Sequence, residues 1–153
     1  MTLDRLNREA LLACCGSDTW VEAMLACRPF RDATALHQKG EAIWRSLTPA
    51  DWLQAFSKHP KIGERATSKW SQQEQQGMSQ ATGHTSQAMR ALNEEYERKF
   101  GWIFIVCATG RSAEEMRTLL EARLSNDPDQ ELQIAAIEHS KIMHIRLEKL
   151  LAE

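Results

Sequence analysis

The stretch DQELQIAAIEHSKIMHIRLEKLL, residues 129–151, contains neither glycine nor proline and reads as one long helix. At 100° per residue seven of its apolar side chains define one sector, and they are Leu132, Ala135, Ala136, Ile142, Met143, Leu147 and Leu150. His139 and Arg146 lie in the same sector. Burying an unpaired guanidinium costs several kcal/mol, so Arg146 needs an accepting partner. An internal carboxylate and an anionic substrate both remain open.

Helix signals continue upstream of this stretch. Residues 86–100 place Met89, Leu92, Tyr96 and Phe100 on one face, and Gly101 closes the helix. Ser112 and Glu115 form a capping box that opens a helix to about residue 124, followed by a turn at 126–128. Shorter helices are predicted at about 7–15, 19–27, 33–46 and 48–57, where Asn7, Asp32 and Thr48 are cap residues.

The segments between these helices are predicted as loops, at about 58–70 and 79–85, with a short helical turn from Ser71 to Gly77. Residues 102–107 form a continuous apolar run with β-branched members, but no second strand is apparent to pair with it. We interpret the run as a buried extended segment or a helix. The expected fold is therefore all-α, a compact single-domain bundle of about seven to eight helices.

Composition narrows the class of protein. The chain has 153 residues, 42% of them hydrophobic and 26% charged, with a formal net charge of -2. This charge argues against a nucleic-acid surface, and no apolar run approaches the ~20 residues that span a bilayer. The first residues lack an apolar signal core, and four cysteines without a C-x-x-C pair suggest reduced thiols. We expect a cytoplasmic protein that binds neither nucleic acid nor membrane.

One polar motif lies outside the hydrophobic periodicity. His59 precedes Pro60 in a loop broken by Gly63, and Glu74 follows at the predicted start of the 71–77 turn. A rigidly held histidine and carboxylate suffice for acid–base chemistry. Two simpler interpretations remain open: His59 is an ordinary loop histidine, and Glu74 completes a capping box by reaching back to the Ser71 N–H.

Several ordered motifs together resemble the family of 2-oxo-4-hydroxy-4-carboxy-5-ureidoimidazoline (OHCU) decarboxylases of urate breakdown. The matching pieces span nearly the whole chain. They are Leu6-Asn7, Trp20, Arg28-Pro29-Phe30, His59-Pro60-x-Ile62-Gly63, Ser71-x-x-Glu74-Gln75, Leu92-Asn93-x-x-Tyr96, Phe100-Gly101, Phe104-Ile105-Val106-Cys107, Gly110-Arg111-Ser112, Asn126-Asp127-Pro128 and Ile145-Arg146-Leu147. Trp102-Ile103 and Thr109 depart from the family pattern near the loop before Phe104.

The resemblance implies one all-helical domain over residues 1–153, a homodimer, and catalysis without a cofactor or metal. It implies that His59 is the catalytic histidine and Glu74 its acidic partner. It further implies that the substrate is contacted by Pro60, by Ser71, Gln72, Gln73, Glu74 and Gln75, and by the main chain of Phe104, Ile105, Val106, Cys107 and Ala108. Arg146 would contact its anionic part.

Two other classes of function compete with this interpretation. A metal-dependent hydrolase would assemble His59, Glu64, Glu74 and His84, but the sequence has no H-E-x-x-H motif. A helical ligand-binding or interaction module would expose an apolar groove and would not need a buried Arg146.

Overall fold

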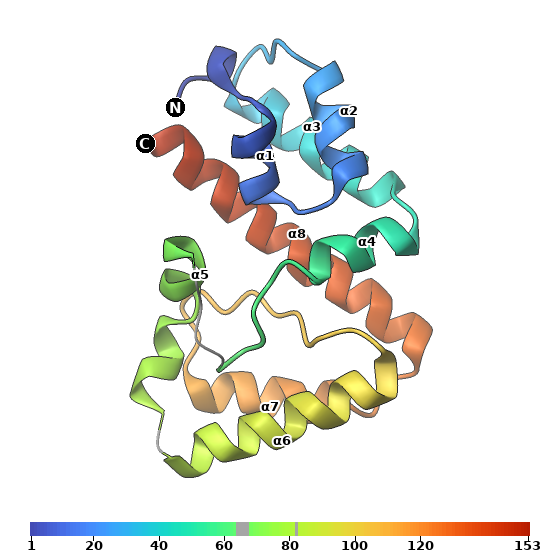
Figure 1. The fold of residues 1–153 in the computed structure, drawn as a ribbon, viewed down its shortest axis with the longest axis vertical. Coiled ribbons are helices and arrows are strands. Elements are labelled where there is room, and N and C mark those ends of the chain that lie inside the picture. Colours follow the sequence, from blue (N-terminus) through green and yellow to red (C-terminus); the bar gives the residue numbers. More distant parts are fainter. Residues whose placement is uncertain (64–67, 82) are drawn as a thin grey trace. The chain divides into compact units, whose positions relative to one another are not determined.

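The computed structural model describes residues 1–63, 68–81 and 83–153, and every regular element in these residues is helical (Figure 1). In this described part of the chain the eight α-helices are α1 (Arg8–Cys14), α2 (Asp18–Ala26), α3 (Ala33–Ser46), α4 (Pro49–Phe56), α5 (Lys69–Glu74), α6 (Gly83–Phe100), α7 (Ala113–Arg123) and α8 (Pro128–Ala152), with short 3-10 helices η1 (Leu3–Arg5) and η2 (Gln76–Gln80). The predicted all-α class and helix number are confirmed.

The chain forms two compact units. One comprises residues 1–58 and 140–153, and the other comprises residues 59–139, so α8 contributes to both. The prediction of one domain over the whole chain stays a prediction. Within the described residues, no helix combines the length and apolar character needed to cross a bilayer.

Local capping explains the helix starts of the first unit. The side chain of Asn7 accepts from the Ala10 N–H at 2.9 Å, and that of Asp32 accepts from the Ala35 N–H at 2.8 Å. Such caps satisfy backbone donors that a helix leaves unpaired. Ser17, which the sequence did not single out, caps α2 by accepting from the Trp20 N–H at 3.2 Å.

Two buried tryptophans of the first unit donate their indole N–H groups to backbone carbonyls. The Trp20 indole donates to the Gly40 carbonyl at 3.0 Å, and the Trp52 indole donates to the Trp44 carbonyl at 2.9 Å. Cys14 and Cys15 are also buried, and burial raises the pKa of each thiol to about 12. Both thiols are therefore neutral at physiological pH, and none of the four cysteines forms a disulfide.

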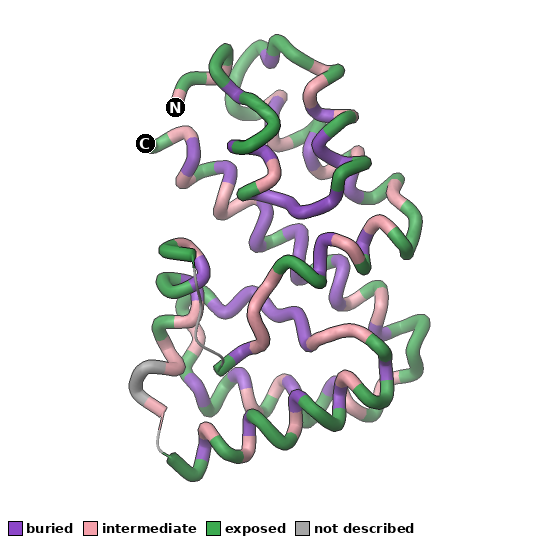
Figure 2. The backbone as a smooth tube through the Cα atoms, in the orientation of Figure 1, coloured by how far each residue is buried: buried purple, intermediate pink, exposed green. Residues whose placement is uncertain are grey.

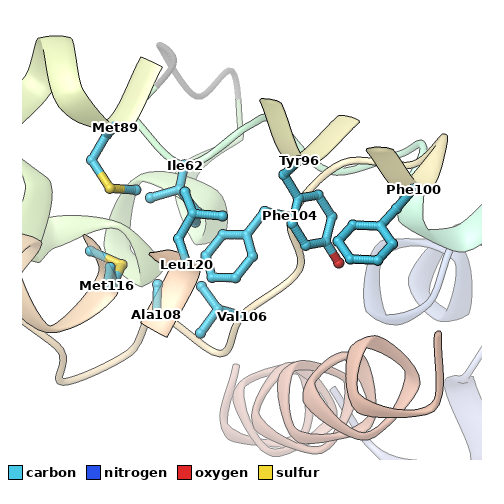
Figure 3. Packing of buried hydrophobic residues seen from close by; sticks show 9 residues of the cluster. All are labelled: Ile62, Met89, Tyr96, Phe100, Phe104, Val106, Ala108, Met116 and Leu120. Carbon is cyan, nitrogen blue, oxygen red and sulfur yellow. The ribbon is translucent and has the colours of Figure 1, made fainter. Parts of the chain in front are cut away.

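The second unit is built on α6 and α7, which lie side by side (Figure 1). Side chains of these two helices, of the segment between them and of the loop before α5 form one apolar cluster (Figure 3). Its members are Ile62, Met89, Tyr96, Phe100, Phe104, Val106, Ala108, Met116 and Leu120. Ile62 brings the loop of His59 into this core. Burying such a side chain contributes roughly 1.5–3 kcal/mol.

Two predicted boundaries were wrong in this unit. The predicted loop at 79–85 contains the end of η2 and the first turn of α6, which begins at Gly83 and not at Ser86. The buried face of α6 also includes Asn93, whereas Leu92 is only half-buried. The run 102–107 is extended and has no strand partner in the described residues.

Candidate active site

The loop that carries His59 is fixed to α6. The side-chain amide of Asn93 donates to the Ile62 carbonyl at 2.8 Å, and Lys61 pairs with Glu97 at 2.8 Å. Asn93 and Glu97 are one helical turn apart, so they lie on the same face of α6. His59 itself is half-buried. The loop is thus held by one helix at two successive residues beyond Pro60.

Gly63 joins this loop to the second predicted motif. Its φ of +93° is a left-handed conformation that favours glycine. In this conformation the Gly63 N–H donates to Oε1 of Gln75 at 2.9 Å. Gln75 directly follows Glu74, so the structure brings together the two motifs that the sequence separates.

Glu74 ends α5 rather than starting it. The cap of α5 is Ser68, whose hydroxyl accepts from the Ser71 N–H at 3.0 Å. The capping-box interpretation needed that N–H for Glu74, so it is wrong, as is the predicted helix start at Ser71. A carboxylate at a helix C-terminus faces the negative end of the helix dipole. Glu74 is nevertheless only 8% exposed, so capping does not explain its position.

Helical spacing divides the 71–75 motif into two faces. Ser71, Glu74 and Gln75 are three and four residues apart and are buried or half-buried, whereas Gln72 and Gln73 are exposed. The structure therefore groups the first three and turns Gln72 and Gln73 to the other side of α5. Substrate contact by any of the five stays a prediction.

Residues 104–108 are buried along their whole length (Figure 2). Side chains supply the hydrogen bonds that a neighbouring strand would otherwise provide. The Ile105 carbonyl accepts from Arg123 at 2.6 Å, the Cys107 N–H donates to Glu138 at 3.2 Å, and the Cys107 carbonyl accepts from Arg111 at 3.1 Å. These three hydrogen bonds explain how the segment can be extended and buried without pairing with a second strand.

Two consecutive residues of α8 link the predicted pieces. Glu138 holds the Cys107 N–H, and the Nε2 atom of His139 lies 3.0 Å from Nε2 of His59. Both α8 side chains are buried, with His139 0% exposed. The sequence placed His139 on the core-facing side but gave Glu138 no role. Glu138 lies three residues after Ala135, at the edge of the apolar sector. This position was the one sign in the sequence that its side chain could be buried.

A buried ion pair supports the other end of the 104–108 segment. Arg123 donates to Oε2 of Glu131 through Nε at 2.8 Å and through Nη2 at 2.5 Å. Tyr96 also donates to this carboxylate, and Asn126 donates to its Oε1 at 3.0 Å. Burial, together with the hydrogen bond to Glu131, raises the pKa of Tyr96. None of these contacts was predicted.

Arg146 belongs to the first unit and is half-buried, so the prediction that it is buried among apolar side chains was wrong. Its Nη1 donates to the Ala13 carbonyl at 3.0 Å. A helical wheel cannot show this, because a long arginine side chain can lie along apolar surface while its charged end reaches solvent. Its contact with the anionic part of a ligand stays a prediction.

The described residues also line a pocket of about 370 Å³ on the α6 side of the loop, and this pocket is partly open to solvent. Its lining is Lys61, Ile62, Gly63, Ser86, Arg90, Asn93 and Glu94, none of which is a predicted site residue. No group of three or more His, Cys, Asp or Glu side chains in the described part of the chain could hold a metal ion. Glu64, a member of the hypothetical metal site, lies outside that part.

Residues 4–148 match the family model for OHCU decarboxylase. The 2-oxo-4-hydroxy-4-carboxy-5-ureidoimidazoline decarboxylase of Amia calva is 33% identical over 136 residues, which are 84% of this chain and 78% of that protein. A crystal structure of OHCU decarboxylase in the presence of (S)-allantoin superposes with a TM-score of 0.88 at 33% identity, covering 97% of this chain and 100% of the other.

Longer relatives are similar as well. The uric acid degradation bifunctional protein TTL of Arabidopsis thaliana is 35% identical over 148 residues, which are 92% of this chain. The chain spans only 46% of that protein's length. The similarity thus concerns one part of the bifunctional protein.

Proposed function

The chain belongs to the OHCU decarboxylase family, and from this membership we propose that it converts OHCU to (S)-allantoin without a cofactor. The observation that carries the proposal is the Gly63–Gln75 hydrogen bond at 2.9 Å, which joins the loop of His59 to the helix of Glu74. A proton-handling pair on two rigidly joined segments is what the reaction needs.

The substrate explains why two such side chains can suffice. OHCU carries a carboxylate and a hydroxyl on one ring carbon, next to a ring C=N bond. When carbon dioxide leaves, the electron pair of the broken C–C bond moves toward this C=N bond, so the substrate supplies its own electron acceptor. The protein must hold the carboxylate out of the ring plane, stabilise the resulting anion and deliver a proton to one face.

We assign these tasks to the predicted residues. His59 hydrogen-bonds the hydroxyl or carboxylate and steers bond breaking, and Glu74 donates the proton or orients the imidazole. Pro60, Ser71 and Gln75 line the ligand beside them. The buried 104–108 segment offers fixed backbone groups to the ring; the Cys107 N–H already binds Glu138, so we expect its neighbours to serve the ligand.

The activity is tested with OHCU generated in situ from urate by the two preceding enzymes. Circular dichroism then follows the appearance of (S)-allantoin. We expect the protein to make this signal appear faster than the uncatalysed reaction does. A rate equal to that without protein would refute the proposal. Allantoin should also raise the melting temperature, which an interaction module without a small-molecule site would not show.

Glu74→Gln should lower kcat by about tenfold or more, because the amide fits the same space but can neither carry charge nor act as an acid. The matched control is the same substitution at Glu95, which is exposed on α6 and should leave the rate unchanged. Steady-state kinetics measure both. Full activity of Glu74→Gln would show that the buried carboxylate has only a structural role.

Arg146→Lys should weaken allantoin binding by about tenfold, since lysine cannot reproduce the planar fork of the guanidinium. Because Arg146 is half-buried, we expect little change in the melting temperature. Isothermal titration calorimetry measures the affinity, with the exposed Arg45→Lys on α3 as control. Unchanged affinity combined with a large loss of stability would show a purely structural role.

We further propose a cytoplasmic homodimer. The resemblance to the family supports the dimer, and the absence of disulfides among the four cysteines supports a reducing compartment. Light scattering coupled to gel filtration would determine the mass in solution, for which the monomer value is 17.4 kDa.

A further inference from the structure

The second unit contains a direct contact between two histidine rings. The Nε2 atoms of His59 and His139 are 3.0 Å apart, the ring centroids are 4.9 Å apart, and the rings meet edge-on at 84°. His139 comes from the middle of α8 and is fully buried, whereas His59 lies on a loop and is half-buried. The more rigid ring therefore belongs to His139.

Such a contact fixes where protons lie. In a hydrogen bond between two imidazole nitrogens, one nitrogen donates and the other accepts. The two facing atoms therefore share one proton, and both cannot carry one at this distance. In a neutral ring the second nitrogen has the opposite state from the first. If Nε2 of His59 donates, its Nδ1 carries no proton, and if Nε2 accepts, its Nδ1 carries one. The role that His139 takes in the bond therefore sets the state of Nδ1 in a neutral His59 ring.

We propose that His139 is a positioning residue that selects the tautomer and the orientation of the His59 ring. The inference rests on the proposed function, in which His59 is the residue that acts on the substrate. A histidine that must donate or accept at one defined atom loses effectiveness when its ring exchanges between tautomers. Buried in α8, His139 removes that freedom before the substrate arrives.

A second histidine pair in the chain provides the control. His37 on α3 and His144 on α8 approach through Nδ1 atoms at 2.8 Å, but their rings are stacked at 26° and both residues are half-buried. This pair belongs to the first unit and includes no predicted site residue. Removing its ring-to-ring bond should not affect the chemistry.

The kinetic test compares two amides that differ by one methylene. His139→Gln places an amide where Nε2 was, whereas the shorter side chain of His139→Asn does not reach that position. We expect His139→Asn to lower kcat by about 10–100-fold, by analogy with the loss of a partner that orients a metal-ligating imidazole. We expect KM to change less than threefold, and His139→Gln to retain at least about a third of wild-type kcat. His37→Ala, which removes the Nδ1 contact of the control pair, should match the wild type.

Nitrogen-15 NMR of the imidazole rings gives a readout that does not depend on activity. In the wild type, one facing Nε2 should show the shift of a protonated nitrogen and the other that of an unprotonated one. His59 should be a single tautomer in the wild type and become a mixture of both in His139→Asn, whose amide does not reach Nε2.

These measurements separate the possible failures. A wild-type protein without activity on OHCU refutes the proposed function, while the spectra still decide whether the pair shares a proton. An active wild type in which His139→Asn has normal kcat, or in which His59 already exists as both tautomers, overturns the inference. A normal spectrum cannot arise from unfolded protein, so a folding defect is recognised separately.

Discussion

His59→Ala should reduce kcat/KM for OHCU by about 10²–10⁴-fold, the contribution of a positioned proton-transfer group. The fold should persist, because the loop is anchored by other residues. Ile62 is buried in the core of the second unit, and its carbonyl accepts from the Asn93 side chain. The Gly63 N–H donates to the Gln75 side chain. Steady-state rates on freshly generated substrate measure the loss.

The matched control for this variant is His84→Ala. His84 is an exposed histidine in the first turn of α6, so its removal should leave both rate and stability unchanged. A His59→Ala protein within threefold of the wild-type kcat/KM would remove His59 from the mechanism. Circular dichroism of both variants would show whether the helices are intact.

Much of the fold could be predicted because its signals are local. Asn7, Asp32 and Ser112 each lie within three residues of the backbone N–H that they cap, and the structure contains all three bonds. The conformation of 102–107 could not be settled in this way. Its backbone partners, Arg123 and Glu138, are distant in sequence, and no local pattern reports them.

In the candidate site, too, local features could be predicted and contacts between distant residues could not. The loop with His59 and Gly63 was predicted because proline and glycine break periodicity locally. The start of α5 was predicted wrongly because Ser68 and Ser71 are both acceptable caps by residue type, and only the fold selects Ser68. The partner of the His59 ring, His139, lies 80 positions away, so the sequence could only place it on a buried face.

The buried pair of Arg123 and Glu131 is where a single substitution should cost the most stability. Their side chains are 8% and 0% exposed, and Tyr96, Asn126 and the Ile105 carbonyl complete the network. Arg123→Met retains an apolar chain over the Phe104 ring, which the guanidinium now covers at 4.6 Å from its centroid. It leaves Glu131, however, as a buried carboxylate without a counter-charge.

We therefore expect Arg123→Met to lower the free energy of unfolding by about 3–5 kcal/mol, the cost of breaking a buried pair by removing one partner. Chemical denaturation measures this. Arg117→Met is the control on the same helix, because its pair with Glu121 is partly exposed (31% and 51%) and should contribute no more than about 0.5 kcal/mol. The double variant Arg123→Met with Glu131→Gln should recover part of the loss, since it removes the stranded charge. Equal, small losses for Arg123→Met and Arg117→Met would show that water or a nearby donor compensates Glu131, and that the 104–108 segment does not depend on this pair.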